Sequence, residues 1–165
     1  MATGFHRDDL IRMDDAELLR LCRVDTFRGT GRGGQKRNVT ESAVRVTHLA
    51  SGLAAASDET RSQIQNRAKA LHLLRHRMAL DLREPVSLGA PPVPRPVSRK
   101  GSEYLLWLAH TLDALDAAGY RVSEAAAACG SSTGRLVRDL ADDPQAWQHV
   151  NQRRQALGMN LLRRD

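Results

Sequence analysis

The sequence is poor in cysteine and in aromatic residues, and these two absences narrow what the protein can be. Two cysteines, Cys22 and Cys129, occur in 165 residues, and they are too far apart to match a metal-binding spacing. A disulfide framework is not expected, so a reducing compartment suits the chain better. Aromatic residues make up 4% of the chain, which disfavours a surface that binds nucleic acid by stacking bases on aromatic rings.

Long hydrophobic segments are also missing. No stretch approaches the roughly 20 apolar residues that a transmembrane helix needs. Residues 1–9 contain early acids and no apolar run, unlike a secretory signal or a transit peptide. We therefore expect a cytoplasmic protein without a membrane partner. The length suits one domain, or a small domain with a helical appendage, and we expect a monomer.

Positive charge is concentrated in the N-terminal half. The formal net charge is +6, and residues 1–83 hold 15 Lys and Arg against 10 Asp and Glu, whereas residues 103–165 hold 7 against 8. Such an excess fits an RNA partner contacted mainly through its phosphates. It is also common in proteins that bind no nucleic acid, where it maintains solubility.

The N-terminal half predicts an α+β domain over residues 1–83, with a small mixed sheet, a glycine-rich loop and a long packing helix. A short helix is expected over residues 14–22, capped by Asp14 or Asp15. Strands are expected over residues 23–27, 43–49 and 53–57. A long helix is expected from Glu59 to about Arg83, where apolar residues recur at helical spacing: Ile64, Ala68, Leu71, Leu74, Met78 and Leu82.

The rest of the chain predicts a linker and a helical module. Five of the six prolines lie between residues 84 and 102, which predicts an extended basic linker there. Residues 103–165 predict a small all-α module with helices over about 103–118, 122–129, 133–142 and 144–157. Its expected core residues are Leu105, Leu108, Leu112, Leu115, Trp107 and Trp147.

Residues 121–138 loosely fit a helix-turn-helix, with Gly130 at the turn. The second helix would present Arg135 and Arg138 to nucleic acid. The alternative is a helical bundle that packs or binds protein. The slightly negative charge of residues 103–165 favours this alternative, since groove-binding domains are usually basic.

The segment richest in chemistry is residues 29–38, Gly-Thr-Gly-Arg-Gly-Gly-Gln-Lys-Arg-Asn. Its glycines let the backbone approach another molecule closely. The spacing of Gly29, Gly31 and Gly34 formally matches a dinucleotide-binding fingerprint, but a strand rather than a helix is expected next. A Walker loop is excluded because Gly-Lys-Ser/Thr is absent. A flexible basic hairpin loop without activity is the plain alternative.

The wider segment 24–52 closely resembles the catalytic domain of class I peptide chain release factors, and so do residues 58–71. The resemblance covers roughly residues 23–83. It includes, in order, the Gly-Gly-Gln (GGQ) signature, the Ser-Ala-Val-Arg strand, the Thr-His-Leu…Ser-Gly turn and the Arg-Ser-Gln helix start. It implies an α+β domain whose loop enters the peptidyl transferase centre of the large ribosomal subunit. There it would promote hydrolysis of the ester that joins a nascent peptide to tRNA.

By this resemblance, Gly33 and Gly34 allow an unusual loop conformation. Gln35 would position the attacking water, and its backbone N–H would stabilise the oxyanion-like transition state. No metal or other cofactor is implied. Gln35 is also a candidate for methylation by a glutamine methyltransferase. The basic and polar residues expected to contact ribosomal RNA are Arg28, Arg32, Lys36, Arg37, Asn38, Arg45, Arg61, Arg67 and Lys69.

The sequence departs from the family at several points. Lys36, Arg37 and Val39 differ from the residues usual there, about two dozen residues precede the first strand, and the chain ends without a long basic tail. We expect no stop-codon-reading domain, so the layout predicts codon-independent release or rescue of stalled ribosomes. Two alternatives stay open: a non-catalytic ribosome- or RNA-binding module, and a helix-turn-helix DNA-binding regulator.

Overall fold

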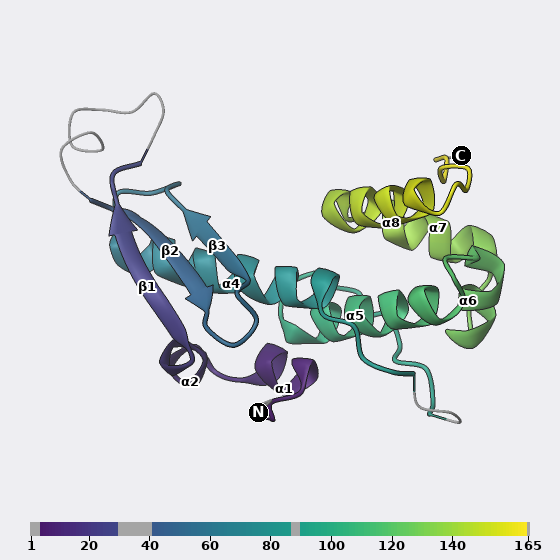
Figure 1. Ribbon diagram of the computed structural model, residues 1–165, viewed down its shortest axis with the longest axis horizontal. Helices are drawn as coiled ribbons and strands as arrows, with labels where there is room; N and C mark the ends of the chain where they lie inside the picture. The colour runs from purple at the N-terminus through teal and green to yellow at the C-terminus, as the bar shows by residue number, and fades with distance from the viewer. Residues whose placement is uncertain (1–3, 30–40, 87–89, 165) are drawn as a thin grey trace. The chain divides into compact units, whose positions relative to one another are not determined.

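The computed structural model describes residues 4–29, 41–86 and 90–164. Contacts divide the chain into two compact units, residues 1–79 and residues 80–165. Figure 1 shows a three-stranded sheet with helices in the first unit and helices in the second. The α+β prediction is therefore confirmed. The predicted boundaries at residues 83 and 102 stay predictions.

The first unit is built on an antiparallel sheet whose strands lie in chain order. Strand β1 (Cys22–Phe27) pairs with β2 (Ala43–His48), and β2 pairs with β3 (Ala54–Ser57). Side chains alternate between the two faces along a strand. Val44 and Val46 are buried on one face, whereas Arg45 is exposed on the other.

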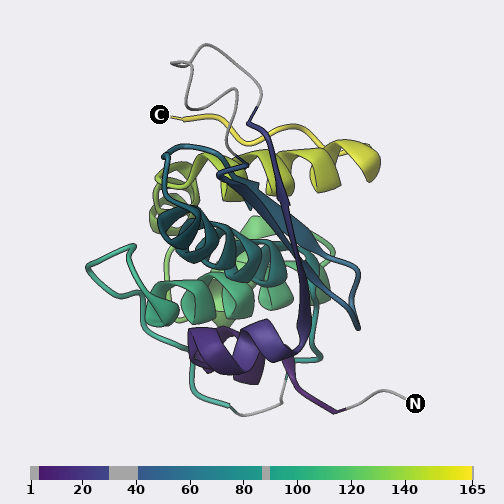
Figure 2. The ribbon, with the colours of Figure 1, turned by 90° about the vertical axis from the view of Figure 1, so that its left-hand side faces the viewer.

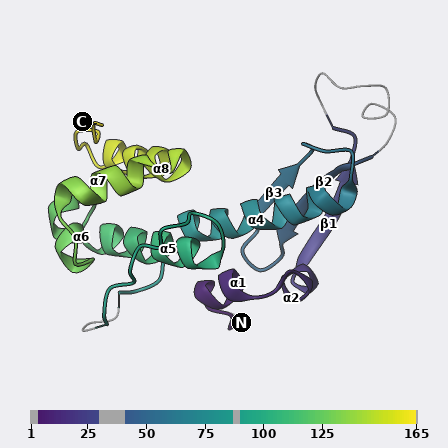
Figure 3. The ribbon, with the colours of Figure 1, turned by 180° about the vertical axis from the view of Figure 1, so that it is seen from behind.

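Helix α4 (Gln63–Asp81) runs along the buried face of this sheet, as Figure 2 and Figure 3 both show. Its buried residues are Asn66, Ala70, Leu71, Leu74, Met78, Ala79 and Leu80. The prediction is confirmed for Leu71, Leu74 and Met78. It is wrong for Ile64, which is 72% exposed, and for Ala68, which is also exposed.

The start of α4 also differs from the prediction. The helix begins at Gln63 rather than Glu59, because residues 58–62 form a turn whose polar groups bond to Asn66. Those bonds direct the Asn66 side of the helix toward the sheet. Ile64 then lies on the solvent side, so apolar spacing alone gives the wrong phase for the first turn.

Two short helices precede the sheet. Helix α1 (Arg7–Arg12) buries Leu10 and Ile11, and its six residues are too few for a periodic pattern, so the sequence does not predict it. Helix α2 (Asp15–Arg20) is capped as predicted, because the Asp14 carboxylate accepts a hydrogen bond from the Glu17 N–H at 2.8 Å. Arg75 of α4 pairs with Asp15 at 2.7 Å and fastens α2 to α4.

The second unit contains four helices among its described residues. They are α5 (Ser102–Ala117), α6 (Val122–Ala128), α7 (Thr133–Ala141) and α8 (Pro144–Ala156), each within a residue or so of its predicted bounds. Before α5, residues 84–86 and 90–101 form neither helix nor strand. The four predicted leucines of α5 are buried, and so is Trp107, whereas Trp147 is half-buried.

Turns in this unit use the residues that their geometry favours. Gly130, between α6 and α7, has a φ of +65°, a conformation that glycine adopts without strain, which confirms it as the turn residue. Asp143 caps α8 by accepting hydrogen bonds from the N–H groups of Gln145 and Ala146. The buried Tyr104 hydroxyl donates to the same carboxylate at 2.8 Å and ties α5 to the start of α8.

Candidate functional site

The predicted catalytic residues Gly33, Gly34 and Gln35 lie outside the described residues. The same holds for four of the predicted RNA contacts, Arg32, Lys36, Arg37 and Asn38. The structure does describe both ends of the segment that carries them. Those ends are Arg28–Gly29 after β1 and Glu41–Ser42 before β2, which we call the loop root.

The sheet brings the two ends of the loop root together. Phe27, the last residue of β1, is the register partner of Ala43, the first residue of β2. The chain therefore leaves the sheet and returns to it at the same end, as in a hairpin. Thr26 also donates to the Glu41 carboxylate across the pair at 3.4 Å. The ends of the GGQ segment are thus held by strand pairing.

A fully buried asparagine connects the loop root to the first turn of α4. The side-chain amide of Asn66 donates to the backbone carbonyl of Ser42 at 2.7 Å and to that of Thr60 at 2.8 Å. Its carbonyl oxygen accepts from the Thr60 N–H at 3.0 Å and from the Thr60 hydroxyl at 3.1 Å. One side chain therefore uses both its donors and its acceptor to join Ser42 to the turn before α4.

Neighbouring groups add to this connection. Gln63, the first residue of α4, donates its side-chain amide to the Glu41 carbonyl. The Ser57 hydroxyl of β3 donates to Asn66 at 3.5 Å. The Ser42 hydroxyl is buried without a hydrogen-bond partner among the described residues. We call the set Ser42, Thr60, Gln63 and Asn66 the root clamp. Gln63 and Asn66 bond to the backbone carbonyls of residues 41 and 42, and Thr60 supports the Asn66 side chain.

No sequence pattern marks the root clamp as functional. The resemblance includes Asn66, but its role is not evident from spacing. One signal is available: a short amide side chain stands four residues before Ala70 and eight before Leu74, at helical spacing with residues that α4 buries. Buried amides are retained when they complete hydrogen bonds that backbone groups would otherwise lack.

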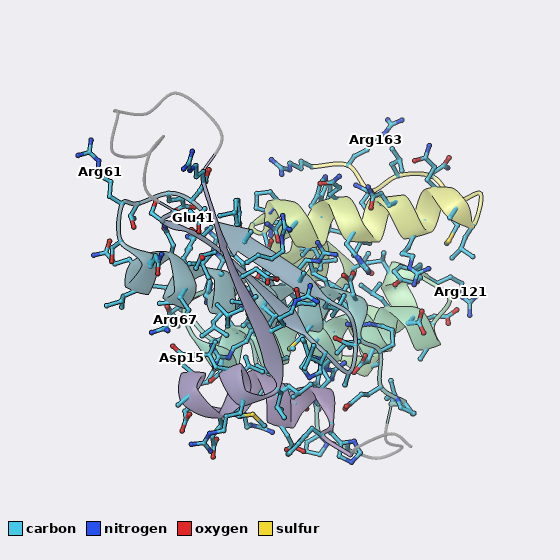
Figure 4. The ribbon with its side chains drawn as sticks, turned by 60° about the vertical axis from the view of Figure 1, so that its left-hand side comes forward. Asp15, Glu41, Arg61, Arg67, Arg121 and Arg163 are labelled. Atoms are coloured by element: carbon cyan, nitrogen blue, oxygen red, sulfur yellow. The ribbon has the colours of Figure 1, made fainter. Side chains whose placement is uncertain are left out.

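The described basic residues of the predicted site lie in separate places. Arg28 is exposed directly after β1, and Arg45 is exposed on the open face of the sheet, with its guanidinium 5.2 Å from the centre of the Phe27 ring. Arg61 is exposed in the turn before α4, Arg67 and Lys69 are exposed in its first two turns, and Figure 4 shows Arg61 and Arg67 pointing away from the sheet. The structure thus presents positive charge around the loop root without gathering these side chains into one cleft.

The loop root contains no histidine. His48 is buried at the far end of β2, where its Nδ1 lies 2.8 Å from the Ser51 hydroxyl and accepts from the Ser51 N–H at 3.3 Å. Burial lowers the pKa of His48, which favours the neutral ring that such an acceptor requires. His48 therefore organises the β2–β3 turn. Within the described ranges, no group of three His, Cys, Asp or Glu side chains could hold a metal ion.

In the part of the chain that the structure describes, no helix combines the length and the apolar character needed to cross a bilayer.

Comparison with known proteins identifies the first unit. The RF-1 domain family matches residues 11–87. Peptide chain release factor 1 of Leptospira biflexa is 50% identical over 68 residues, which are 41% of this chain and 19% of that protein. Peptide chain release factor 1 of Acidiphilium cryptum is 46% identical over 79 residues, covering 48% of this chain and 21% of its own.

Another curated release factor gives a similar match. Peptide chain release factor 2 of Paramagnetospirillum magneticum is 54% identical over 57 residues, which are 34% of this chain and 15% of that protein. The chain thus spans about a fifth of the length of the curated relatives it matches. Over residues 11–87, just under half of the chain, the protein matches the RF-1 domain family and is similar to class I peptide chain release factors.

Proposed function

We propose that this protein acts in the cytoplasm on the ribosome, where it hydrolyses the ester bond of peptidyl-tRNA. The observation that carries the proposal is the RF-1 match over residues 11–87, which encloses an intact Gly33-Gly34-Gln35. The root clamp supports it, since a loop that must reach a reaction centre benefits from fixed ends.

The proposed reaction is the addition of water to the ester carbonyl. Water bonds to the carbonyl carbon, the bond to the terminal ribose oxygen of tRNA breaks, and that oxygen takes up a proton. The products are a peptide with a free carboxylate and a deacylated tRNA. Gln35 would position the water, and its backbone N–H would stabilise the oxyanion as the tetrahedral species forms.

We further propose that release by this chain is independent of the codon. For release factors, a stop codon selects the ribosome on which they act. Outside the RF-1 match, the described residues form mainly α5–α8, and we propose that this helical unit makes the selection for this chain. Gln35 is the proposed target of a glutamine methyltransferase. A mass increase of one methyl group on the peptide that contains Gln35, in protein purified from its source, would support that assignment.

A DNA-reading role for α6 and α7 is disfavoured by their charges. Arg135, at the start of α7, pairs with Asp139 at 3.7 Å. Asp139 and Asp142 near the end of α7 also pair with Arg95, so two carboxylates accompany the two arginines of α7 and reduce the positive charge that the helix could offer a phosphate backbone. A groove-binding helix is normally basic along its exposed side.

The deciding experiment measures peptide release from ribosomes carrying labelled peptidyl-tRNA, with a stop codon, a sense codon or no codon in the decoding site. We expect release from all three complexes. Gln35→Ala keeps the backbone N–H but removes the side chain that would position the attacking water, so it should lower the rate by about 100-fold or more. Gln145→Ala, the same substitution at an exposed position of α8, is the matched control and should leave the rate unchanged.

Each outcome distinguishes between the proposed function and its alternatives. Absence of release from every complex would overturn the enzymatic proposal. Ribosome binding without release would instead support the non-catalytic RNA-binding alternative. Release confined to stop codons would overturn codon independence while keeping the hydrolysis.

A further inference from the structure

The C-terminal segment has a charge pattern that the average for residues 103–165 conceals. Residues 144–164 contain four arginines and no aspartate or glutamate. Seven of the eight acids of residues 103–165 precede Pro144. The slightly negative net charge of this half therefore describes its first part, and its argument against nucleic acid does not extend to α8 and the residues after it.

Residues after α8 fold back along the helix. The Leu162 N–H donates to the Asn151 side chain at 2.7 Å, and Arg154 donates to the Asn160 carbonyl at 2.8 Å. The Arg164 guanidinium lies 5.5 Å from the centre of the Trp147 ring. These contacts hold residues 159–164, the C-terminal tail, against α8, as Figure 1 shows.

This folding gathers four guanidiniums on and beside one helix. Arg153 and Arg154 belong to α8, and Arg163 and Arg164 belong to the tail. Figure 4 shows Arg163 pointing away from α8 into solvent. We call these four residues the basic face.

The basic face differs from several other arginines of this unit in what it bonds to. Arg83 pairs with Asp113 at 2.9 Å, Arg95 with Asp142 at 3.0 Å and Arg121 with Glu124 at 2.6 Å. Arg154 donates instead to the carbonyl oxygens of Asn160 and Tyr120, and Arg164 to that of Ala141.

Among the described residues, nothing therefore neutralises the charge of the basic face. Across the residues that the structure describes, no carboxylate lies within ion-pair distance of its four guanidiniums. A carbonyl oxygen accepts a hydrogen bond without cancelling a positive charge, so the tail is held in place and the four charges are kept. A solvated helix face stabilised by its own ion pairs would show the opposite pattern.

We propose that the basic face is a docking surface for an RNA phosphate backbone. Guanidiniums match phosphate oxygens in charge and in donor geometry. The exposed amides of Gln148, Gln152 and Gln155 add neutral donors and acceptors of the kind that contact sugar and phosphate. Base stacking plays no part, because the one aromatic ring of this segment, Trp147, is covered by Arg164.

RNA fits this surface better than an anionic membrane does. A helix that lies in a bilayer surface needs a free apolar face. Helix α8 has already buried Ala146 and Val150 in its own unit. Leu157 and Leu161, beyond the end of the helix, are exposed but form no helical stripe.

The test is binding of the full chain to a fluorescein-labelled RNA hairpin, followed by anisotropy over a range of salt concentrations. R153Q/R163Q removes two charges from the basic face. Each lost phosphate contact lowers the slope of log affinity against log salt by about 0.7–0.9. Two contacts should therefore weaken binding by about 25- to 60-fold at about 0.1 M salt.

Three further variants serve as controls. R99Q/K100Q removes the same charge from exposed positions before α5 and should leave affinity within about twofold, since long-range fields are screened at this salt. R153K/R163K keeps the charge and should keep the salt slope. R163Q alone, at an exposed side chain of the tail, should weaken binding by about 5- to 8-fold. Circular dichroism and tryptophan fluorescence confirm that each variant is folded.

The proposal is overturned if R153Q/R163Q binds RNA as the unaltered chain does, or if R99Q/K100Q weakens binding equally. It is also overturned if R153Q/R163Q loses affinity for phosphatidylglycerol vesicles while its affinity for RNA is unchanged. The measurement needs neither ribosomes nor peptide release, so failure of the proposed hydrolysis would not affect it.

Discussion

Replacing Asn66 with leucine tests whether the root clamp is the polar centre of the first unit. The substitution keeps a side chain of similar size in a position that is fully buried. It removes the two hydrogen bonds that Asn66 donates and those that it accepts from Thr60 and Ser57. The loss would fall on the loop root and on the turn before α4.

The magnitude follows from the groups left without partners. The Ser42 carbonyl is in a residue only 2% exposed, so water cannot replace the amide there. An unsatisfied buried polar group costs about 1–3 kcal/mol. The backbone groups of Thr60 are half-buried and can be partly hydrated. We therefore expect Asn66→Leu to lower the free energy of unfolding of this unit by about 3 kcal/mol.

The distribution of tryptophan allows the two units to be followed separately. Trp107 and Trp147 both lie in the second unit, and the chain contains no other tryptophan. Urea unfolding followed by tryptophan fluorescence therefore reports on the second unit, whereas circular dichroism reports on both. Asn66→Leu should move the circular dichroism transition of the first unit and leave the fluorescence midpoint unchanged.

Two comparisons make the result decisive. Asn160→Leu, the same change at an exposed residue, should alter stability by less than about 0.5 kcal/mol. Asn66→Asp keeps the acceptor but sets a carboxylate against the carbonyls of Ser42 and Thr60, so its deficit should shrink as the pH falls and the acid is protonated. A loss below about 1 kcal/mol in Asn66→Leu would refute the reasoning, because the amide would then be replaceable by packing.

Other contacts give further predictions. Burial and Asp143 raise the pKa of Tyr104, so its hydroxyl stays a donor, and Tyr104→Phe should cost about 1.5–3 kcal/mol in the fluorescence transition; an unchanged midpoint would contradict this. Asp113, 6% exposed, accepts from Arg83 and from the Glu84 N–H, and Asp113→Ala should cost about 3–5 kcal/mol because Arg83 loses its buried partner; a loss near that of a surface substitution would show the pair to be dispensable. Burial lowers the pKa of His48, so its contribution to stability is present above its unfolded pKa of about 6.5 and is lost as the pH falls through the lower folded value. His48→Gln should flatten that acid-side loss in circular dichroism melts, and an unaltered pH profile would exclude His48 as a contributor.

Most of the fold could be predicted because local chemistry and tertiary packing agree. Strands β1 and β2 alternate polar and apolar residues, α2 and α8 begin at acidic caps, and the leucine spacing of α5 matches its buried face. Helix α1 could not be predicted, since six residues show little periodicity. The predicted orientation of the first turn of α4 was wrong, because hydrogen bonds to Asn66, rather than the apolarity of Ile64, set the orientation of the helix.

The candidate site also contains residues that the sequence predicts and residues that it does not. Motif order predicts Gly33, Gly34 and Gln35, because the GGQ signature stands in order with the strand, turn and helix-start motifs of the release-factor resemblance. Spacing does not reveal Gln63 or Asn66 as partners of the loop root. Their partners are backbone carbonyls of Glu41 and Ser42, and a backbone group has no residue identity that a sequence pattern could show.

The glycine content of the segment explains why such a clamp is needed. Four of the six residues 29–34 are glycine, and glycine loses more conformational entropy on ordering than any other residue. The entropy of closing a loop also has to be met by contacts at its ends. Strand pairing at Phe27 and Ala43, together with the amides of Gln63 and Asn66, supplies those contacts outside the glycines. The ends of the segment are therefore fixed by the sheet and by α4, so larger residues are not needed within it for that purpose, which suits the close approach to RNA that we propose.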